Sequence, residues 1–346
     1  MGEPQLIKNN VTLISNILRN NIPSLFIFND LFTLSFLLLK YSNSVIINCS
    51  NLKAVSIIRS TPTYEKMKFL EDSNQAKFYY DDILQINSSD LSMYSHGSIS
   101  QRNFLLIMLQ YMVIRDYFLI FKDSKNLLGW QYTGFVLLYF CKRISHKCAF
   151  EYYFNLILKN NNLFLYYTGN KEDRFAIIEK KICNKYKIKS ICIPHGIEYA
   201  YRVPAGLVGD TFYCTTKFSQ RYLSILYSDK KRFIYDCSVS KKMFSRHQYL
   251  DGESKVVFFP EWTDTGVILF ILKELIKFNI LVLVKLHAKD SAANYKECSG
   301  GFSYISDFSM AISNNICLAM KSTVLLEALY NNSIPIAILT DAKDRA

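Results

Sequence analysis

The strongest constraint in this sequence is the regular alternation of short apolar runs, many of them β-branched, with helical stretches in its second half. The predicted strands are residues 255–260, 280–286, 302–305, 315–319 and 334–339, and the predicted helical stretches are residues 265–278, 308–314 and 323–330. Alternation of this kind predicts a parallel sheet with helical crossovers, which is a doubly wound α/β domain.

The first half repeats this alternation less regularly. Predicted strands at residues 162–167, 188–193 and 211–215 are separated or followed by predicted helices at residues 172–187 and 217–227. An earlier strand–helix–strand unit is predicted from strands at residues 24–28 and 44–49, with a turn at Asn29-Asp30 and a helix at residues 31–40 between them. We therefore predict two Rossmann-like domains facing a cleft, residues 1–237 and 255–346, joined by a polar and basic linker at residues 238–254.

Membrane-spanning and secretory signals are weak in this sequence. The most apolar stretches, residues 24–40 and 103–122, are interrupted by charged side chains, whereas a spanning helix needs about 20 nearly uncharged residues. The first residues lack the basic and apolar pattern of a signal peptide. The nine cysteines are scattered without C-x-x-C pairs, so reduced thiols are expected. A soluble, cytoplasmic chain is the resulting expectation.

The net charge of +12 indicates an anionic partner. The basic residues are dispersed, and no zinc finger, RNA-recognition signature or basic-helix motif accompanies them. We therefore expect no nucleic acid partner. An anionic acceptor, or peripheral contact with the inner face of the cell membrane, fits the charge better.

Polar groups follow four of the predicted strands at the point where each strand ends. They are His195-Gly196, Glu261, His287 and Ser322-Thr323. Ligands of open parallel sheets bind in the crevice beyond the carboxyl ends of the strands. These residues are therefore the predicted site.

In the second domain the pattern favours phosphate binding. Ser322 and Thr323 open a predicted helix, whose N–H groups and dipole favour anions, although a plain N-cap is the alternative. His287 is placed to donate to a phosphate oxygen, with a satisfied structural histidine as the alternative, and Lys285 makes its neighbourhood positive. Glu327 lies one helical turn after Thr323, where it either bonds a ribose hydroxyl or faces solvent.

The first domain would provide the acceptor side. His195 is the candidate general base, with a structural turn histidine as the alternative, and Gly196 allows the sharp turn beside it. Glu198, Asp30 and Asp173 are further candidate bases. Glu261, in the second domain, either contacts substrate or caps the helix that follows.

Three segments resemble bacterial glycosyltransferases of the GT-B fold: residues 194–197 (PHGI), 285–289 (KLHAK) and 321–329 (KSTVLLEAL). The similarity is greatest to inverting enzymes of capsule, lipopolysaccharide and teichoic acid synthesis, such as CDP-glycerol glycerophosphotransferases and bacterial sialyltransferases. In these families the middle segment usually reads Lys-x-His-Pro, and here Ala288 replaces the proline. The resemblance implies that His195 is the base or an acceptor partner, and that His287, Ser322 and Thr323 hold the donor phosphate.

The resemblance further implies a nucleotide-activated sugar as donor substrate and a glycan or lipid-linked glycan as acceptor. It implies no cofactor and no metal, and the sequence contains no Asp-x-Asp motif. Members of this fold usually continue with helices after the last strand, so a truncated chain is one interpretation. Two alternative functions stay open: a nucleotide-sugar epimerase of the same fold, and a non-catalytic glycan- or nucleotide-binding module.

Overall fold

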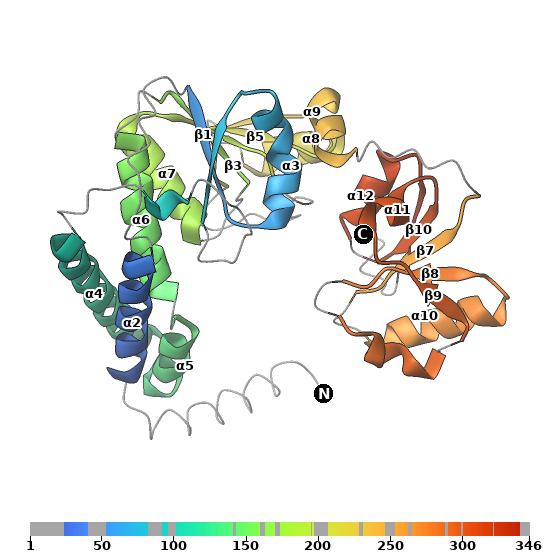
Figure 1. Ribbon diagram of the computed structural model, residues 1–346, viewed down its shortest axis with the longest axis horizontal. Helices are drawn as coiled ribbons and strands as arrows, with labels where there is room; N and C mark the ends of the chain where they lie inside the picture. The colour runs from blue at the N-terminus through green and yellow to red at the C-terminus, as the bar shows by residue number, and fades with distance from the viewer. Residues whose placement is uncertain are drawn as a thin grey trace. The chain divides into compact units, whose positions relative to one another are not determined.

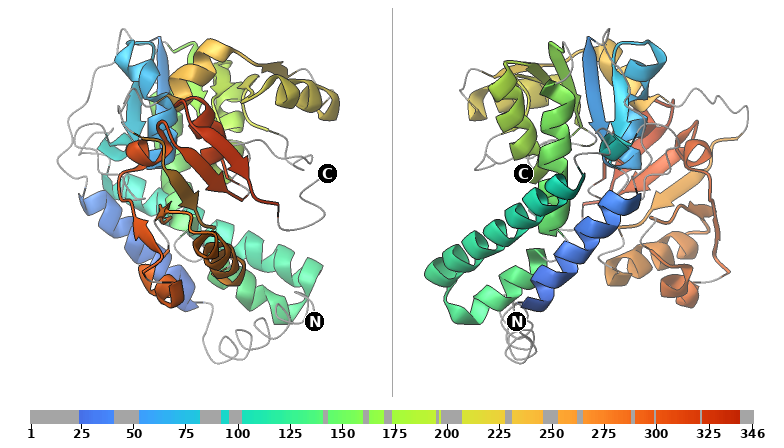
Figure 2. Two further views of the ribbon diagram at one scale, coloured as in Figure 1. Left: turned by 90° about the vertical axis from the view of Figure 1, so that its right-hand side faces the viewer. Right: turned by 60° about the vertical axis from the view of Figure 1, so that its left-hand side comes forward.

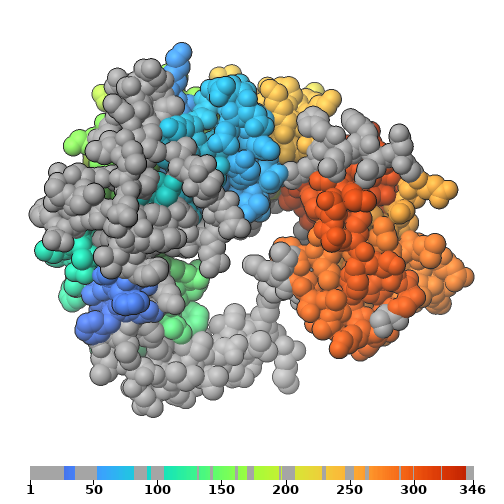
Figure 3. Space-filling view, in the orientation of Figure 1, coloured from blue at the N-terminus to red at the C-terminus, as the bar shows by residue number. Residues whose placement is uncertain are grey.

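The chain divides into two compact units, Met1–Ile234 and Tyr235–Ala346, in a computed structural model (Figures 1 and 3). The residues that the structure describes are 24–40, 53–81, 92–95, 102–140, 143–159, 163–169, 174–194, 196, 207–227, 231–245, 253–261, 265–287, 290–298, 300–320 and 322–339. The predicted strand at residues 44–49 lies outside this set.

Unit 1 contains a parallel sheet. Its described strands are β1 (Ala54–Ile58), β2 (Lys77–Tyr80), β3 (Leu165–Thr168), β4 (Lys189–Cys192), β5 (Thr211–Tyr213) and β6 (Arg232–Ile234), in the order β2-β1-β3-β4-β5-β6. All five residues of β1 are buried, as expected for a parallel strand covered on both faces. The chain leaves β1 towards β2 and then returns to the other side of β1, so the sheet is doubly wound.

Helices cover both faces of this sheet. They are α3 (Thr61–Asp72), α6 (Arg143–Lys159), α7 (Arg174–Tyr186) and α8 (Lys217–Leu226). The right-handed rule for crossovers places α3 on one face and the helices after β2 on the other, as Figures 1 and 2 show for α3 against α6 and α7. Within α7, Phe175, Ile178 and Ile182 are buried, which confirms the helical face that their spacing predicted.

A group of helices lies beside α6. One of these helices includes residues 24–28, which the sequence pattern predicted to be a strand. The group consists of α2 (Ser24–Lys40), α4 (Arg102–Leu128) and α5 (Trp130–Phe140), which pack on one another and on α6 (Figure 2). The predicted strand at residues 24–28 is therefore wrong, because the apolar run continues as one helix through Asn29 and Asp30. Asp30 does not cap a helix that begins at residue 31, because its carboxylate is buried and accepts hydrogen bonds from the Tyr117 hydroxyl and the Ser145 N–H.

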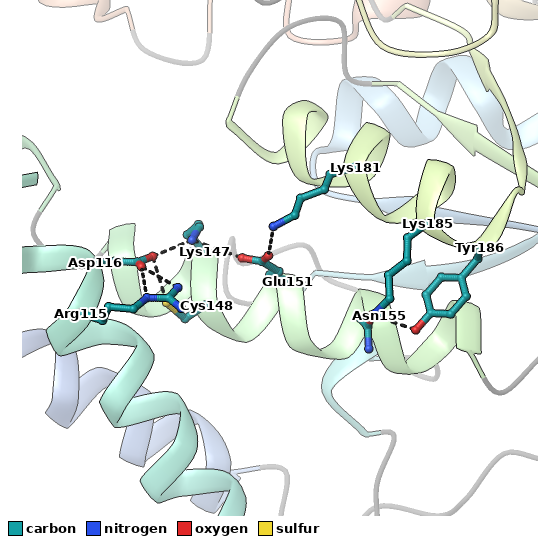
Figure 4. A network of polar contacts seen from close by, with 9 residues as sticks. All are labelled: Arg115, Asp116, Lys147, Cys148, Glu151, Asn155, Lys181, Lys185 and Tyr186. Atoms are coloured by element: carbon teal, nitrogen blue, oxygen red, sulfur yellow. Dashed lines mark hydrogen bonds and ion pairs between the residues drawn. The ribbon is translucent and has the colours of Figure 1, made fainter. Parts of the chain in front are cut away.

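A polar network fastens α4 to α6 and α7 (Figure 4). Asp116 on α4 accepts hydrogen bonds from Arg115 at 2.9 Å and from Lys147 on α6 at 2.6 Å. Lys147 also pairs with Glu151 at 3.2 Å, and Glu151 pairs with Lys181 on α7 at 3.3 Å. Burial opposes ionisation of Asp116, but the hydrogen bonds from Lys147 and Arg115 outweigh it and lower the pKa of this carboxyl.

We expect Asp116→Asn to destabilise the protein by about 2 kcal/mol at neutral pH, because two partly exposed cations lose their anion. Since the folded-state pKa of Asp116 lies below its ordinary value of 3.8, the ion pair stabilises the fold above that pH and is lost as the pH falls below it. The difference in free energy of unfolding between variant and wild type, measured by urea unfolding across pH, should therefore disappear in acid. Glu274→Gln, which breaks an exposed pair with Lys277, is the matched control. A difference in free energy of unfolding that stays constant with pH would contradict a stabilising role for the ionised Asp116 carboxylate.

Unit 2 contains a second parallel sheet. Its described strands are β7 (Val256–Phe259), β8 (Val282–Val284), β9 (Phe302–Tyr304), β10 (Ile316–Ala319) and β11 (Ile334–Ala337), in the order β11-β10-β7-β8-β9. The helices are α9 (Cys237–Phe244), α10 (Thr265–Lys277), α11 (Phe308–Ile312) and α12 (Val324–Leu329), with the 3-10 segment η4 (Ala292–Cys298). Every strand predicted after residue 255 is present, and the two parallel doubly wound sheets confirm the α/β class.

Part of the range predicted as a linker is helical. α9 begins at Cys237, and its N-cap Asp236 accepts from the Ser238 and Val239 N–H groups. The Phe244 carbonyl accepts a 2.8 Å hydrogen bond from the Asn331 amide, and the Phe244 and Tyr330 rings stack at 5.6 Å. Because these contacts bind α9 to the residues after α12, α9 belongs to unit 2.

Candidate functional site

A pocket of about 490 Å³ lies at the carboxyl ends of β7, β8 and β10. It is lined by Phe259, Pro260, Glu261, Lys285, Leu286, His287, Phe308, Met320, Ser322 and Val324. The order β11-β10-β7-β8-β9 makes β7 the strand at which the chain direction reverses, since β8 follows on one side and β10 is added on the other. Ligands of open α/β sheets bind at such a switch point.

β8 presents Lys285 and His287 to the pocket. The Lys285 N–H donates to the Phe258 carbonyl at 3.0 Å, which continues the ladder past the end of the strand. The His287 carbonyl accepts from the Asp290 N–H at 2.9 Å, and Asp290 is itself bonded by Asn294 and Tyr295 of η4. This turn holds the histidine at the carboxyl edge of the sheet, with its side chain exposed.

β7 and β10 complete the pocket. The Phe259 and Phe308 rings meet edge to face at 6.2 Å, and Met320 adds a third apolar side chain after β10. Glu261 follows β7 and is half-buried. One side of the pocket is therefore aromatic and apolar, whereas Lys285, His287 and Ser322 supply donors.

Ser322 serves both the pocket and the start of α12. Its hydroxyl oxygen accepts from the Val324 N–H at 3.2 Å, which leaves the hydroxyl proton to donate towards a ligand. The N–H groups of Leu325, Leu326 and Glu327 bond to the carbonyls of Ser322 and Thr323. These bonds are what the plain N-cap alternative requires, because they occupy the first N–H groups of α12 within the chain. The helix has only six residues, so its dipole is short.

Apart from Gly196 and Asp30, the predicted residues divide into three groups. Glu261, Lys285, His287 and Ser322 meet in the pocket. Thr323 caps α12 without a side-chain hydrogen bond, and Glu327 is buried; neither lines the pocket. His195, Glu198 and Asp173 lie outside the described residues.

Two acceptor-side residues are described. Gly196 is buried in a bend after β4. Asp30, predicted to lie at the carboxyl end of a strand, is instead buried inside α2, with its carboxylate on Tyr117 and the first turn of α6. Its contacts are structural, so the placement of Asp30 at a strand end is corrected.

A second pocket of about 500 Å³ lies at the opposite edge of the unit 2 sheet, along residues 253–256, 280–283 and 300–303. This is the amino-terminal edge of β7, β8 and β9, where parallel sheets do not usually bind ligands. Among the described residues, no group of three or more His, Cys, Asp or Glu side chains is placed to hold a metal ion. No described helix is long and apolar enough to cross a membrane.

Comparison with known proteins gives few matches. No protein-family model matches the sequence, and no curated protein matches it. Among solved structures, the chain is similar to CalG4, the calicheamicin glycosyltransferase, at 8% sequence identity and a TM-score of 0.36, over 83% of this chain and 80% of that chain.

Proposed function

We propose that this chain is a glycosyltransferase that moves a sugar, or a related alcohol phosphate unit, from a nucleotide-activated donor to a surface-glycan acceptor. The observation that carries the proposal is the meeting of Lys285, His287 and Ser322 in one pocket at the switch point of a parallel sheet. Cationic and hydroxyl donors at that place suit a phosphate. The resemblance of residues 285–289 and 321–329 to bacterial surface-polysaccharide enzymes points to the same donor.

The pocket has room and surfaces for a nucleotide. A volume of about 490 Å³ lies within the range of small-molecule sites. Phe259, Phe308 and Met320 offer an apolar surface for a nucleobase or ribose face, while Lys285 and His287 are placed for the phosphates. Glu261 is the acidic group in the pocket and would accept from a ribose or sugar hydroxyl.

In the proposed inverting step, an acceptor hydroxyl oxygen attacks the anomeric carbon of the donor. The new carbon–oxygen bond forms as the bond from that carbon to the phosphate oxygen breaks, and the hydroxyl proton passes to His195. The electron pair leaves on the nucleoside phosphate, where Lys285, His287 and the Ser322 hydroxyl stabilise the developing charge. Glycans of the capsule, lipopolysaccharide or teichoic acid type, free or lipid-linked, are the proposed acceptors.

The first experiment is a thermal-shift screen against CMP, CDP, UDP, GDP and their activated sugars. A ligand at about 100 times its dissociation constant should add roughly 2.7 kcal/mol of stability. We expect one nucleotide series to raise the melting temperature of the wild type and to lose most of that shift in Lys285→Gln. Lys273→Gln, an exposed lysine of the same unit outside the pocket, should keep the full shift.

The outcomes separate the proposal from its alternatives. No shift from any nucleotide, or an unchanged shift in Lys285→Gln, would remove the pocket as the donor site. Turnover of the selected donor without any acceptor would favour the epimerase. Binding without turnover over a broad acceptor panel would favour the non-catalytic module.

A further inference from the structure

Helix α4 is apolar on two opposite faces. Leu109, Val113 and Tyr117 are buried in the core of unit 1. On the other side, four large apolar side chains are exposed at a spacing of three or four residues: Ile107, Tyr111, Ile114 and Phe118. At 100° per residue they fall within a stripe of roughly 60°. A helix that is apolar all round normally has both faces covered.

Large exposed apolar side chains also occur on the neighbouring helices of the same group. Phe28 and Phe32, one turn apart on α2, are 68% and 73% exposed. At the corner between α4 and α5, Leu127, Leu128 and Trp130 are also exposed around Gly129, whose φ of +78° permits the sharp turn. We call these residues, together with the four of the α4 stripe, the apolar helical face. Figure 2 shows α2 and α4 side by side in this group.

The charges on the exposed side of α4 are mostly positive. Lys122 and Lys125 continue the stripe by helical spacing, and both are exposed. The Lys125 ammonium lies 4.4 Å above the Trp130 ring. Of the two described α4 acids, Asp123 is exposed, but Asp116 is buried and already paired with Arg115 and Lys147.

An apolar pocket of about 330 Å³ opens in the same helical group. Leu119, Ile120, Phe140 and Ile144 form its apolar lining, and Arg143 and Lys147 bring cations to it beside Asp116. Lys147 is already paired with Asp116 and Glu151. The α4 residues of this lining lie on the side of the helix turned away from the exposed stripe, so the pocket is not part of the stripe's surface.

We propose that α2, α4 and α5 form a docking surface for a bilayer that contains anionic phospholipids. Tryptophan, tyrosine and lysine together are typical of the membrane–water interface, where the rings lie at headgroup level and the ammonium groups reach phosphates. The cores of protein–protein interfaces are instead depleted in lysine. The contact is with the bilayer surface, since no described helix is long and apolar enough to cross it. This proposal does not depend on the donor pocket.

Vesicle flotation of the full chain tests the surface. We expect binding to mixed phosphatidylcholine–phosphatidylglycerol vesicles to exceed binding to pure phosphatidylcholine vesicles by at least about tenfold. Lys122→Gln/Lys125→Gln should weaken binding to the mixed vesicles by about 25-fold. Phe118→Ser/Leu127→Ser/Trp130→Ser should weaken it by at least about tenfold. The control Phe218→Ser/Ile225→Ser removes equally exposed apolar side chains from α8 and should bind like the wild type.

A spectroscopic measurement keeps the test independent of the triple variant. The chain has two tryptophans, so Trp262→Phe leaves Trp130 as the only one. Its fluorescence should shift to the blue when mixed vesicles are added and stay unchanged with neutral ones. Equal binding by the wild type and the triple variant, no binding of the wild type to mixed vesicles, or a wild-type dimer that the triple variant separates would each overturn the proposal. Nucleotide-induced thermal shifts, measured without vesicles, should be the same in the lysine variant, the triple variant and the α8 control as in the wild type.

Discussion

Replacing His287 with alanine is expected to lower turnover by roughly 100-fold, since loss of one well-placed donor to a developing anion typically costs that much. His287 lines the pocket at the end of β8 with its side chain exposed, so its removal creates no buried cavity. The fold should therefore persist, and the urea midpoint should match that of the wild type. Initial rates with the donor that the nucleotide screen selects provide the measurement.

The kinetic pattern identifies how His287 acts. If it bonds the phosphate only as charge develops, kcat and kcat/KM fall together, whereas a binding role raises KM alone. His287→Gln keeps an N–H donor and should recover part of the lost rate. Lys273→Ala, on the exposed side of α10, is the control and should turn over like the wild type. Unchanged turnover in His287→Ala would remove this residue from the mechanism.

The sheet of unit 2 could be predicted because its strands and helices differ clearly in sequence. β-branched and aromatic runs such as Val256–Phe259 are bounded by polar or proline residues, and the helix between β7 and β8 has an apolar face with Ile268 and Leu272 buried. Local pattern and tertiary packing agree there. The predicted strand ends shifted by up to two residues, because ladder pairing with the neighbouring strand, rather than composition, fixes where a strand stops.

The helices before residue 160 were harder to predict because they are apolar on more than one face. In α2, the run from Ser24 to Phe28 has the composition of a buried strand, and Asp30 suggests a cap. What decides the helix is contact with α4 and α6, where Tyr117 and Ser145 satisfy the Asp30 carboxylate. Partners 87 and 115 residues away cannot be inferred from local sequence.

The candidate site was predictable to the extent that strand ends were. Glu261, Lys285, His287 and Ser322 follow their strands within three residues, so the parallel sheet brings them to one edge. Glu327 was predicted to bond a ribose hydroxyl or to face solvent, whereas it is buried in the fold and does not line the pocket. Phe308 and Met320 were missed because an aromatic or methionine side chain carries no sequence signal that separates a pocket wall from a core.

The second large effect is expected in unit 1, at a buried cluster that includes His146. Asp81, directly after β2, accepts 2.7 Å hydrogen bonds from the Tyr94 hydroxyl and from His146, which lies in the first turn of α6. The three side chains are at most 4% exposed. Asp81→Ala would leave two buried polar groups without their acceptor, at a cost of about 3–5 kcal/mol.

In Asp81→Ala, His146 and Tyr94 could not easily move to find other hydrogen-bond partners, because both are held by aromatic contacts. The His146 ring packs 4.7 Å from Phe175, and the Tyr94 ring meets Tyr153 edge to face at 5.2 Å, so neither polar group can turn to water without breaking an aromatic contact. Asp81→Asn keeps the shape and one acceptor oxygen and should cost only about 1–2 kcal/mol. Urea unfolding followed by circular dichroism measures both variants, with exposed Asp123→Ala as a control expected within about 0.5 kcal/mol of wild type. If Asp81→Ala were as stable as that control, the cluster would not be what binds β2 to α6.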